Sequence, residues 1–168
     1  MIYITTPITT SRLVLQPIAV DDYAFVLQLV NSDGWIQFIG DRNVHSEEAA
    51  KAYIRKIQQT PNLIYWVARL NDNQTPVGII SYMKRVYLDN YDLGFAFLPE
   101  FQQQGLAFEA ARGILDFVTN NMHEKIILAT LLPENVKSIK LLEKLGFQFS
   151  ATVDVEKECL HIYQLNVT

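Results

Sequence analysis

The segment from Leu98 to Ala111, LPEFQQQGLAFEAA, most constrains the fold because it joins an apolar strand to a helix through a polar turn. Pro99 has no amide hydrogen for a β-ladder, so it ends the strand. Three glutamines follow, and Gly105 stands where a helix of small and apolar residues begins. The first amides of a helix have no intrahelical partner and carry partial positive charge, so this junction is a candidate anion site. A polar surface turn without a ligand is the alternative.

Apolar periodicity along the rest of the chain predicts an α+β fold. We expect one domain over residues 1–168, with a mixed central sheet and the order β-α-α-β-β-β-α-β-α-β-β. The segment 31–45, which contains Gly34 and Gly40, is expected to be a loop. The predicted strands cover 12–18, 63–70, 77–87, 91–97, 125–131, 147–153 and 159–167, and the predicted helices cover 21–30, 46–58, 105–120 and 135–144.

Composition argues against several classes of function. Hydrophobic residues make up 49% of the chain, but no apolar run reaches the roughly 20 residues that a membrane helix needs. A net charge of −4 without a long Lys/Arg run argues against a nucleic-acid partner. The single cysteine, Cys159, excludes an intramolecular disulfide, and segment 1–12 lacks a signal-peptide pattern, so we expect a cytoplasmic location. The histidines lack the spacing of a zinc site, so no metal is expected: they are His45, His123 and His161.

The turn does not match the common nucleotide-binding motifs. No two of the seven glycines stand one residue apart, and no G-x-x-x-x-G-K-[ST] sequence occurs. The run from Gln102 to Ala107, QQQGLA, instead resembles the Q/R-x-x-G-x-G/A acyl-CoA signature of the GCN5-related N-acetyltransferases (GNAT). Three further segments resemble the branch that contains the ribosomal-protein N-terminal acetyltransferases: TSRLVLQPI, WIQFIGDRNVHSEEAAKAYI and PENVKSIKLLEKLGF. The resemblance spans nearly the whole chain in the family's order.

This resemblance implies a mostly antiparallel sheet with helices on both faces, and an acetyl-CoA-dependent transferase that acetylates a primary amine. The implied acceptor is a protein N-terminus or a small-molecule amine. No metal, nucleic acid or membrane is expected to take part, and monomer and homodimer stay open. The backbone of Phe97 and Leu98 is expected to hold the pantetheine arm, with one amide facing the thioester carbonyl. The implied cofactor-binding residues are Phe97, Leu98, Gln102, Gln103, Gln104, Gly105, Leu106, Ala107, Asn135, Ser138 and Lys144.

The resemblance also implies candidate catalytic residues. Asp92 stands where the family commonly carries a glutamate, which implies a general base acting through water; pairing with Lys84 or Arg85 is the alternative. Many relatives have a tyrosine where this chain has Leu142, so Ser138 is the next candidate to hydrogen-bond the leaving thiolate. A bond from Ser138 to its own helix backbone is the alternative. The implied substrate-binding residues are Trp35, Phe38 and Asp92.

Two departures from the family's pattern leave alternatives open. Without the tyrosine, the chain is also compatible with a non-catalytic acyl-CoA-binding or regulatory module. A purely structural interaction domain, which would not bind CoA, is a third possibility. Relatives often carry Arg or Lys in the diphosphate turn, whereas this turn has glutamines and the acidic Glu100. Anion binding there is therefore expected to rest on backbone amides and to depend only modestly on salt. The acidic balance of the chain is compatible with a cationic acceptor such as a polyamine.

Overall fold

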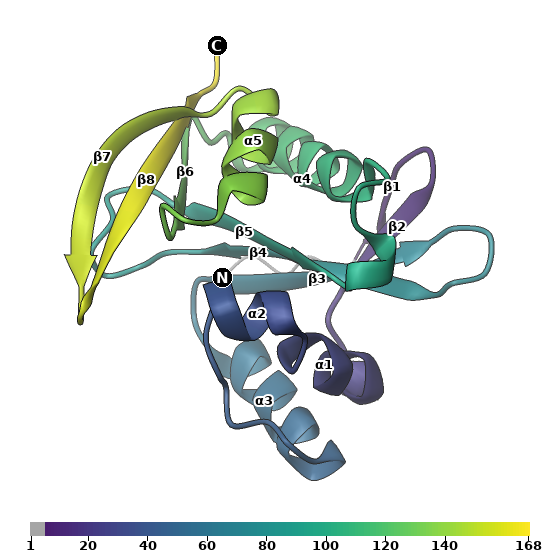
Figure 1. Ribbon diagram of the computed structural model, residues 1–168. Helices are drawn as coiled ribbons and strands as arrows, with labels where there is room; N and C mark the ends of the chain where they lie inside the picture. Colours follow the sequence, from purple (N-terminus) through teal and green to yellow (C-terminus); the bar gives the residue numbers. More distant parts are fainter. Residues whose placement is uncertain (1–5) are drawn as a thin grey trace.

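An eight-stranded sheet forms the centre of the computed structural model, which describes residues 6–168 (Figure 1). Residues 1–5, part of the segment in which no signal peptide was predicted, lie outside the described part. The strand order is β1-β2-β3-β4-β5-β6-β8-β7, and only the β5–β6 pair is parallel within this part, which confirms the predicted mixed, mostly antiparallel sheet. The strands are β1 Ile8–Thr9, β2 Leu13–Pro17, β3 Leu63–Leu70, β4 Pro76–Met83, β5 Asp92–Phe97, β6 Ile126–Leu131, β7 Gln148–Val155 and β8 Glu158–Asn166.

Helices cover both faces of the sheet, as the family resemblance implied. In Figure 1, α1, α2 and α3 lie on one face, and α4 and α5 lie on the other. Short 3-10 turns precede α1 and α4. The helical elements are η1 Val20–Asp22, α1 Tyr23–Val30, α2 Asp33–Phe38, α3 Glu47–Gln59, η2 Pro99–Phe101, α4 Leu106–Met122 and α5 Val136–Lys144.

Two short elements were not predicted. The helix α2 occupies six residues of the segment that was expected to be a loop, and it buries Trp35. A helix this short presents one buried aromatic residue, so no apolar period is visible in the sequence. The strand β1 has only two residues, and its Ile8 pairs with Leu15 of β2. Both elements are held by contacts with the rest of the fold rather than by a pattern of their own.

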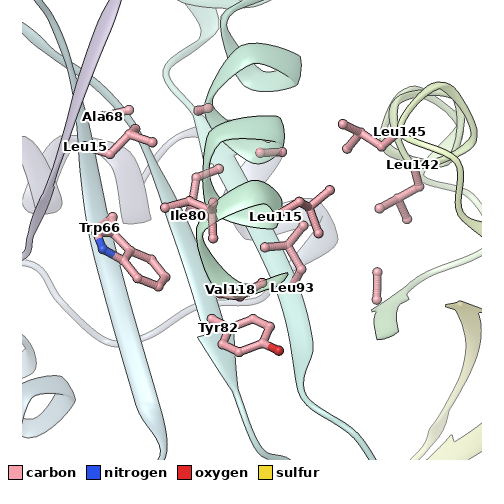
Figure 2. Packing of buried hydrophobic residues seen from close by; sticks show 14 of the residues in the cluster. Leu15, Trp66, Ala68, Ile80, Tyr82, Leu93, Leu115, Val118, Leu142 and Leu145 are labelled. Carbon is pink, nitrogen blue, oxygen red and sulfur yellow. The ribbon is translucent and has the colours of Figure 1, made fainter. Parts of the chain in front are cut away.

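Alternating side chains divide the buried residues between two cores. Trp66 and Ile80 point toward α4 and α5, whereas Val67 and Ile79 point toward α1 and α3. We call the first group the α4-side core and the second the α3-side core. Figure 2 shows side chains of the α4-side core gathered between the sheet and the two helices; those labelled are Leu15, Trp66, Ala68, Ile80, Tyr82, Leu93, Leu115, Val118, Leu142 and Leu145.

The strands β5 and β6 diverge after a single pair of residues. All six residues of β5 are paired with β4. Pairing with β6 is limited to Asp92 and Leu128, beside the hydrogen bond from the Leu128 amide to the Tyr91 carbonyl at 2.9 Å. Because the strands are parallel, the gap opens toward their C-terminal ends, from which the chain continues into α4 and α5 (Figure 1).

Candidate active site

The backbone at the end of β5 presents an open amide to the gap. The Leu98 amide donates to the Val77 carbonyl of β4 at 2.9 Å, and the Leu98 carbonyl accepts from the Phe101 amide at 3.0 Å. Along an antiparallel pair, successive residues direct their backbone groups alternately toward one neighbouring strand and toward the other. Because the Leu98 amide bonds β4, the Phe97 amide faces the opposite side, where β6 lies. Both backbone groups of Leu98 are hydrogen-bonded within the fold. Of the two residues predicted to contact pantetheine through their backbone, Phe97 therefore stays the candidate.

Packing fixes the position of Phe97. Its ring lies over Gly78 of β4, where an added Cβ would be only 2.5 Å from the ring. Its carbonyl accepts a hydrogen bond from Gln102 Nε2 at 3.0 Å. With the ring packed and the carbonyl occupied, the amide is the group of Phe97 that remains available to a ligand.

The glutamines of the turn serve mainly to shape it. Gln102 ties the turn to Phe97, and Gln104 Nε2 donates to the Glu100 carbonyl at 2.9 Å. Gln103 is exposed and has a left-handed backbone, with φ of 60°. All three glutamines are exposed, but the side chains of Gln102 and Gln104 are already hydrogen-bonded, which leaves Gln103 as the glutamine of the turn whose side chain makes no hydrogen bond within residues 6–168.

The start of α4 supplies the amides predicted to bind an anion. Gly105 has φ of 76°, a left-handed conformation that glycine adopts without strain, and α4 begins at the next residue. The amides of Leu106 and Ala107 have no carbonyl partner within the helix. The side chain of Leu106 is buried in the α4-side core, so only its backbone is available to a ligand.

Arg12 places a positive charge beside this turn, which the sequence did not predict. Arg12 Nη1 donates to the Gln104 carbonyl at 2.9 Å, and its Nε bonds Glu109 Oε2 at 2.7 Å. Thr10 Oγ1 also donates to Glu109, at 2.6 Å. The turn itself contains no Arg or Lys, as the sequence shows, but the fold places the guanidinium of Arg12 against it. Arg12 belongs to the family-like segment TSRLVLQPI, but it lies more than 90 residues from the turn in sequence, so only the folded chain reveals this contact.

A pocket of about 790 Å³ starts at the turn and runs along α4. Gly105, Phe108 and Lys144 line it, together with Arg12 and Arg112. Lys144 Nζ lies 4.5 Å from the centroid of the Phe108 ring, and Arg112 Cζ lies 5.9 Å from it. The structure thus brings Lys144 to the predicted diphosphate turn, although 39 residues separate it from Gly105. The pocket is also lined by Glu109, which is paired with Arg12, and by Asp116. The ring of Phe108 with Arg112 and Lys144 beside it is the part of the lining that suits an anionic, nucleotide-like group.

The helix α5 carries the hydroxyl of Ser138 in its first turn, and it has Leu142 where many relatives have a tyrosine. Asn135 Oδ1 accepts from the Ser138 amide at 3.4 Å, which makes Asn135 the N-cap of this helix. Ser138 is half-buried, and its amide rather than its hydroxyl makes this bond. Leu142 is 1% exposed and packs in the α4-side core. The leucine therefore has a packing role at the position where relatives carry an acid.

Asp92 is almost completely enclosed. Its Oδ2 accepts from Arg85 Nε at 2.8 Å and from Thr130 Oγ1 at 2.5 Å, and its side chain is 1% exposed. Burial raises the pKa of Asp92, while the charge of Arg85 and the hydrogen bonds from Thr130 and Arg85 act in the opposite direction. The structure shows the predicted alternative of an ion pair with Arg85, whereas Lys84 contacts the Asp89 carbonyl.

The two predicted acceptor-site aromatics differ in position. Trp35 is 5% exposed and belongs to the α3-side core, so it is an anchor of α2 and does not line an open surface. Its indole nitrogen is buried without a hydrogen-bond partner among the described residues. Phe38 is half-buried at the end of α2 and stays a candidate for contact with the acceptor.

Two kinds of feature are absent from residues 6–168. The helices in this part are too short or too polar to span a bilayer. The same residues contain no cluster of three or more His, Cys, Asp or Glu side chains arranged to hold a metal ion.

Comparison with known proteins identifies the family that this architecture represents. The family model described as an acetyltransferase (GNAT) domain matches residues 12–148. This chain belongs to the GNAT acetyltransferase family. The GNAT chain is 30% identical over 141 residues to the uncharacterized N-acetyltransferase YnaD of Bacillus subtilis (strain 168), covering 84% of this chain and 82% of YnaD. The prediction of a GNAT N-acetyltransferase is confirmed at this level.

Two solved structures share the fold of the GNAT chain at low sequence identity. The ribosomal-protein-S5-alanine acetyltransferase from Vibrio fischeri has a TM-score of 0.79 at 17% identity, with 96% of each chain covered. The spermidine N-acetyltransferase from Vibrio cholerae, solved with CoA and spermine, has a TM-score of 0.78 at 16% identity, covering 94% of this chain and 96% of that chain. Likeness at these identities is likeness of fold.

The network around Glu109 predicts a specific loss of stability in acid. Partial burial raises the pKa of Glu109, but the hydrogen bonds from Thr10 and Arg12 outweigh it, so the net pKa lies below the ordinary value of 4.5. A carboxylate with a depressed folded-state pKa stabilises the fold above its unfolded pKa, and this contribution disappears as the pH falls through the folded value. We expect the free energy of unfolding to decrease below about pH 4.5 more steeply in the wild type than in Glu109→Gln.

Urea denaturation from about pH 6 to about pH 3 measures this difference. Glu143→Gln is the matched control because Glu143 is exposed on α5, and it should follow the wild-type curve. Identical pH slopes for wild type and Glu109→Gln would show that the network contributes no such stabilisation.

Proposed function

We propose that this GNAT chain transfers the acetyl group of acetyl-CoA to a primary amine. The observation that carries the proposal is the opening between β5 and β6, which has the Phe97 amide on one side and leads to the amides at the start of α4. Backbone donors in a family fold built around acyl-CoA suit a thioester and a diphosphate better than they suit a neutral ligand.

Different residues of the site would bind different parts of acetyl-CoA. The α4 amides at Leu106 and Ala107 would take the diphosphate, and Gly105 lets it approach the backbone. Arg112 and Lys144, beside the Phe108 ring, would take the adenosine end and its phosphate. Gln103 is positioned to add a neutral hydrogen bond from the exposed side of the turn.

The reaction is a direct displacement at the thioester carbonyl. The amine nitrogen forms a bond to the carbonyl carbon, the carbon–sulfur bond breaks, and the sulfur leaves as a thiol whose proton balances the one lost by the amine. The Phe97 amide would donate to the carbonyl oxygen as negative charge develops there, an effect worth about 3 kcal/mol for one such donor. Because this donor is a main-chain group, side-chain substitution at Phe97 does not remove it.

Ser138 is the proposed hydrogen-bond donor to the departing sulfur. It lies in the first turn of α5, and its hydroxyl is not used in the capping bond with Asn135. The partial positive charge of the α5 N-terminus would also favour a thiolate there. Leu142 has a hydrocarbon side chain packed in the core, and such a side chain has no proton to donate.

The acceptor is either a protein N-terminus or a small amine. The fold is equally close to a ribosomal-protein acetyltransferase and to a spermidine acetyltransferase, with TM-scores of 0.79 and 0.78. A non-catalytic acyl-CoA-binding module is the second candidate, and two observations favour it: Leu142 replaces the usual acid, and Asp92 is enclosed.

Thiol release measured with acetyl-CoA and a panel of acceptors tests the function. The panel contains spermidine, a lysine ester and short peptides with free Ala or Ser N-termini, and calorimetry measures CoA binding in parallel. We expect CoA to bind and at least one acceptor to release thiol above the hydrolysis background. Binding without turnover on any acceptor would favour the non-catalytic module, and absence of CoA binding would refute both candidates.

Gly105→Ala tests the diphosphate turn. The residue has φ of 76°, and an added Cβ would lie 3.3 Å from Arg12 Nη2. We expect CoA binding to weaken about tenfold, because the side chain strains the turn and blocks the approach to the amides. Gly40→Ala is the matched control: Gly40 has φ of 108°, so the variant carries similar strain away from the turn. Equal CoA affinity in both variants would exclude the turn as the anion site.

Ser138→Ala tests the role of the hydroxyl. If Ser138 assists the leaving sulfur, kcat falls by about tenfold or more while the Kd for CoA stays within about twofold of wild type. Ser150→Ala, at an exposed position on β7, is the control and should leave both values unchanged. A rise in Kd with unchanged kcat would instead make Ser138 a binding residue.

A further inference from the structure

Side chains continue the contact between β5 and β6 where the backbone pairing ends. Asp92 is the first residue of β5, and its pairing with Leu128 is the last backbone register between the two strands. Thr130 lies two residues farther along β6, on the side where the strands separate. Its hydroxyl donates to Asp92 Oδ2 at 2.5 Å. A side-chain bond therefore spans the gap immediately beyond the last backbone contact.

Arg85 joins this bond from a third element. It lies in the connection between β4 and β5, and its Nε donates to the same carboxylate oxygen at 2.8 Å. We call Arg85, Asp92 and Thr130 the apex cluster. The apex cluster links the β4–β5 connection, β5 and β6 at the point from which the opening widens.

The carboxylate of the apex cluster is shut off from solvent. Asp92 is 1% exposed and Arg85 34% exposed. The connection between β4 and β5 also carries the buried Leu88, and the Tyr87 ring centroid lies 6.0 Å from Arg85 Cζ. A buried carboxylate is tolerated when it is paired and hydrogen-bonded, and removal of one partner destabilises it strongly. The apex cluster therefore resists movement of β6 relative to β5.

This geometry differs from that of a general base. A base has to reach the amine directly or through one water molecule. Asp92 Oδ2 already accepts from Arg85 and Thr130, and the side chain has almost no exposed surface. The carboxylate is held between Arg85 and Thr130 at the closed end of the opening, and its enclosure keeps it from an incoming acceptor.

The angle that the apex cluster sets between β5 and β6 determines how far apart their C-terminal ends lie. Phe97 lies five residues beyond Asp92 on β5, a distance of about 17 Å along an extended strand, and the α4 turn follows it. On the other side, β6 leads into the N-terminus of α5, which carries Ser138. A small change in the angle between the strands at Asp92 therefore becomes a larger change in the separation of these two ends.

We propose that Arg85, Asp92 and Thr130 are positioning residues that hold β5 and β6 at the separation that acetyl-CoA requires. The proposal rests on the proposed function only in that CoA is the ligand of the opening. It assigns to Asp92 a structural contribution to cofactor affinity in place of proton transfer, and it adds Thr130 to the residues on which activity depends.

Calorimetric titration of the full chain with CoA tests the proposal without any acceptor. Thr130→Val keeps the shape of the side chain and removes the donor, so CoA affinity should weaken about tenfold, or about 1.4 kcal/mol. Thr130→Ser restores the hydroxyl and should bind within about twofold of wild type. Thr152→Val is the matched control because Thr152 is exposed on β7, and it should bind CoA as wild type does.

Asp92→Asn separates positioning from base catalysis. If Asp92 is a positioning residue, Asp92→Asn should weaken CoA binding, and the pH profile of kcat/KM should keep its wild-type shape. Unchanged CoA affinity in both Thr130→Val and Asp92→Asn overturns the proposal. So does loss of the acidic limb of the profile in Asp92→Asn alone, which identifies a base.

Thermal unfolding of each variant establishes that the titrated protein is folded. Should Thr130→Val fail to fold, Arg85→Lys carries the test, because it keeps the charge but loses the Nε donor. It should then weaken CoA binding, and wild-type affinity in Arg85→Lys would overturn the proposal. Absence of CoA binding by the wild type would refute the proposed function itself, whereas wild-type binding with unaffected variants refutes only the role of the apex cluster.

Discussion

The interruption of the β5–β6 ladder after one residue pair is the constraint on which the rest of the structure depends. A continuous parallel ladder would pair the backbone groups of both strands and leave no opening, because buried backbone groups are almost always hydrogen-bonded. Here the Phe97 amide faces a gap instead, and the N-termini of α4 and α5 follow the two separated strand ends. The site that we propose for an extended, anionic cosubstrate would rest on unpaired backbone and would need few specific side chains.

Where the β5–β6 ladder is interrupted, interactions other than backbone hydrogen bonds have to hold the two parts of the sheet together. The α4-side core supplies it, because its members come from both sides of the gap and pack under the same helices (Figure 2). The residues that link the two sides include Leu93 of β5, Ile127 and Ala129 of β6, Leu142 of α5 and Tyr163 of β8. Leu142 therefore helps to hold the two halves of the sheet together, which gives a physical reason for an apolar residue at this position.

Much of the fold could be predicted because most elements carry a local signal. β-Branched and aromatic runs marked the long strands. The helices predicted over 46–58 and 135–144 begin at Ser46 and Asn135, and both residues cap their helix in the structure. The short helix α2 escaped prediction because Trp35 is its only buried residue. The Leu98 backbone was assigned to the cosubstrate, yet it bonds β4 and the following turn, and no sequence pattern reveals which neighbour an amide faces.

The sequence by itself determined the family, the order of the longer elements and the strand-to-helix turn at Gly105, because each rests on local patterns of residues that are close together in the chain. The tertiary structure decided which charges meet. It placed Arg12 beside Gln104, and it enclosed Asp92 between Arg85 and Thr130. The pair of Arg85 and Asp92 was already an alternative at the level of sequence, because the two residues lie seven positions apart. The contacts of Arg12 with Gln104 and of Thr130 with Asp92 join residues that are far apart in the sequence. Local propensity carries no trace of these two contacts, and only the packing of the sheet against its helices fixes them.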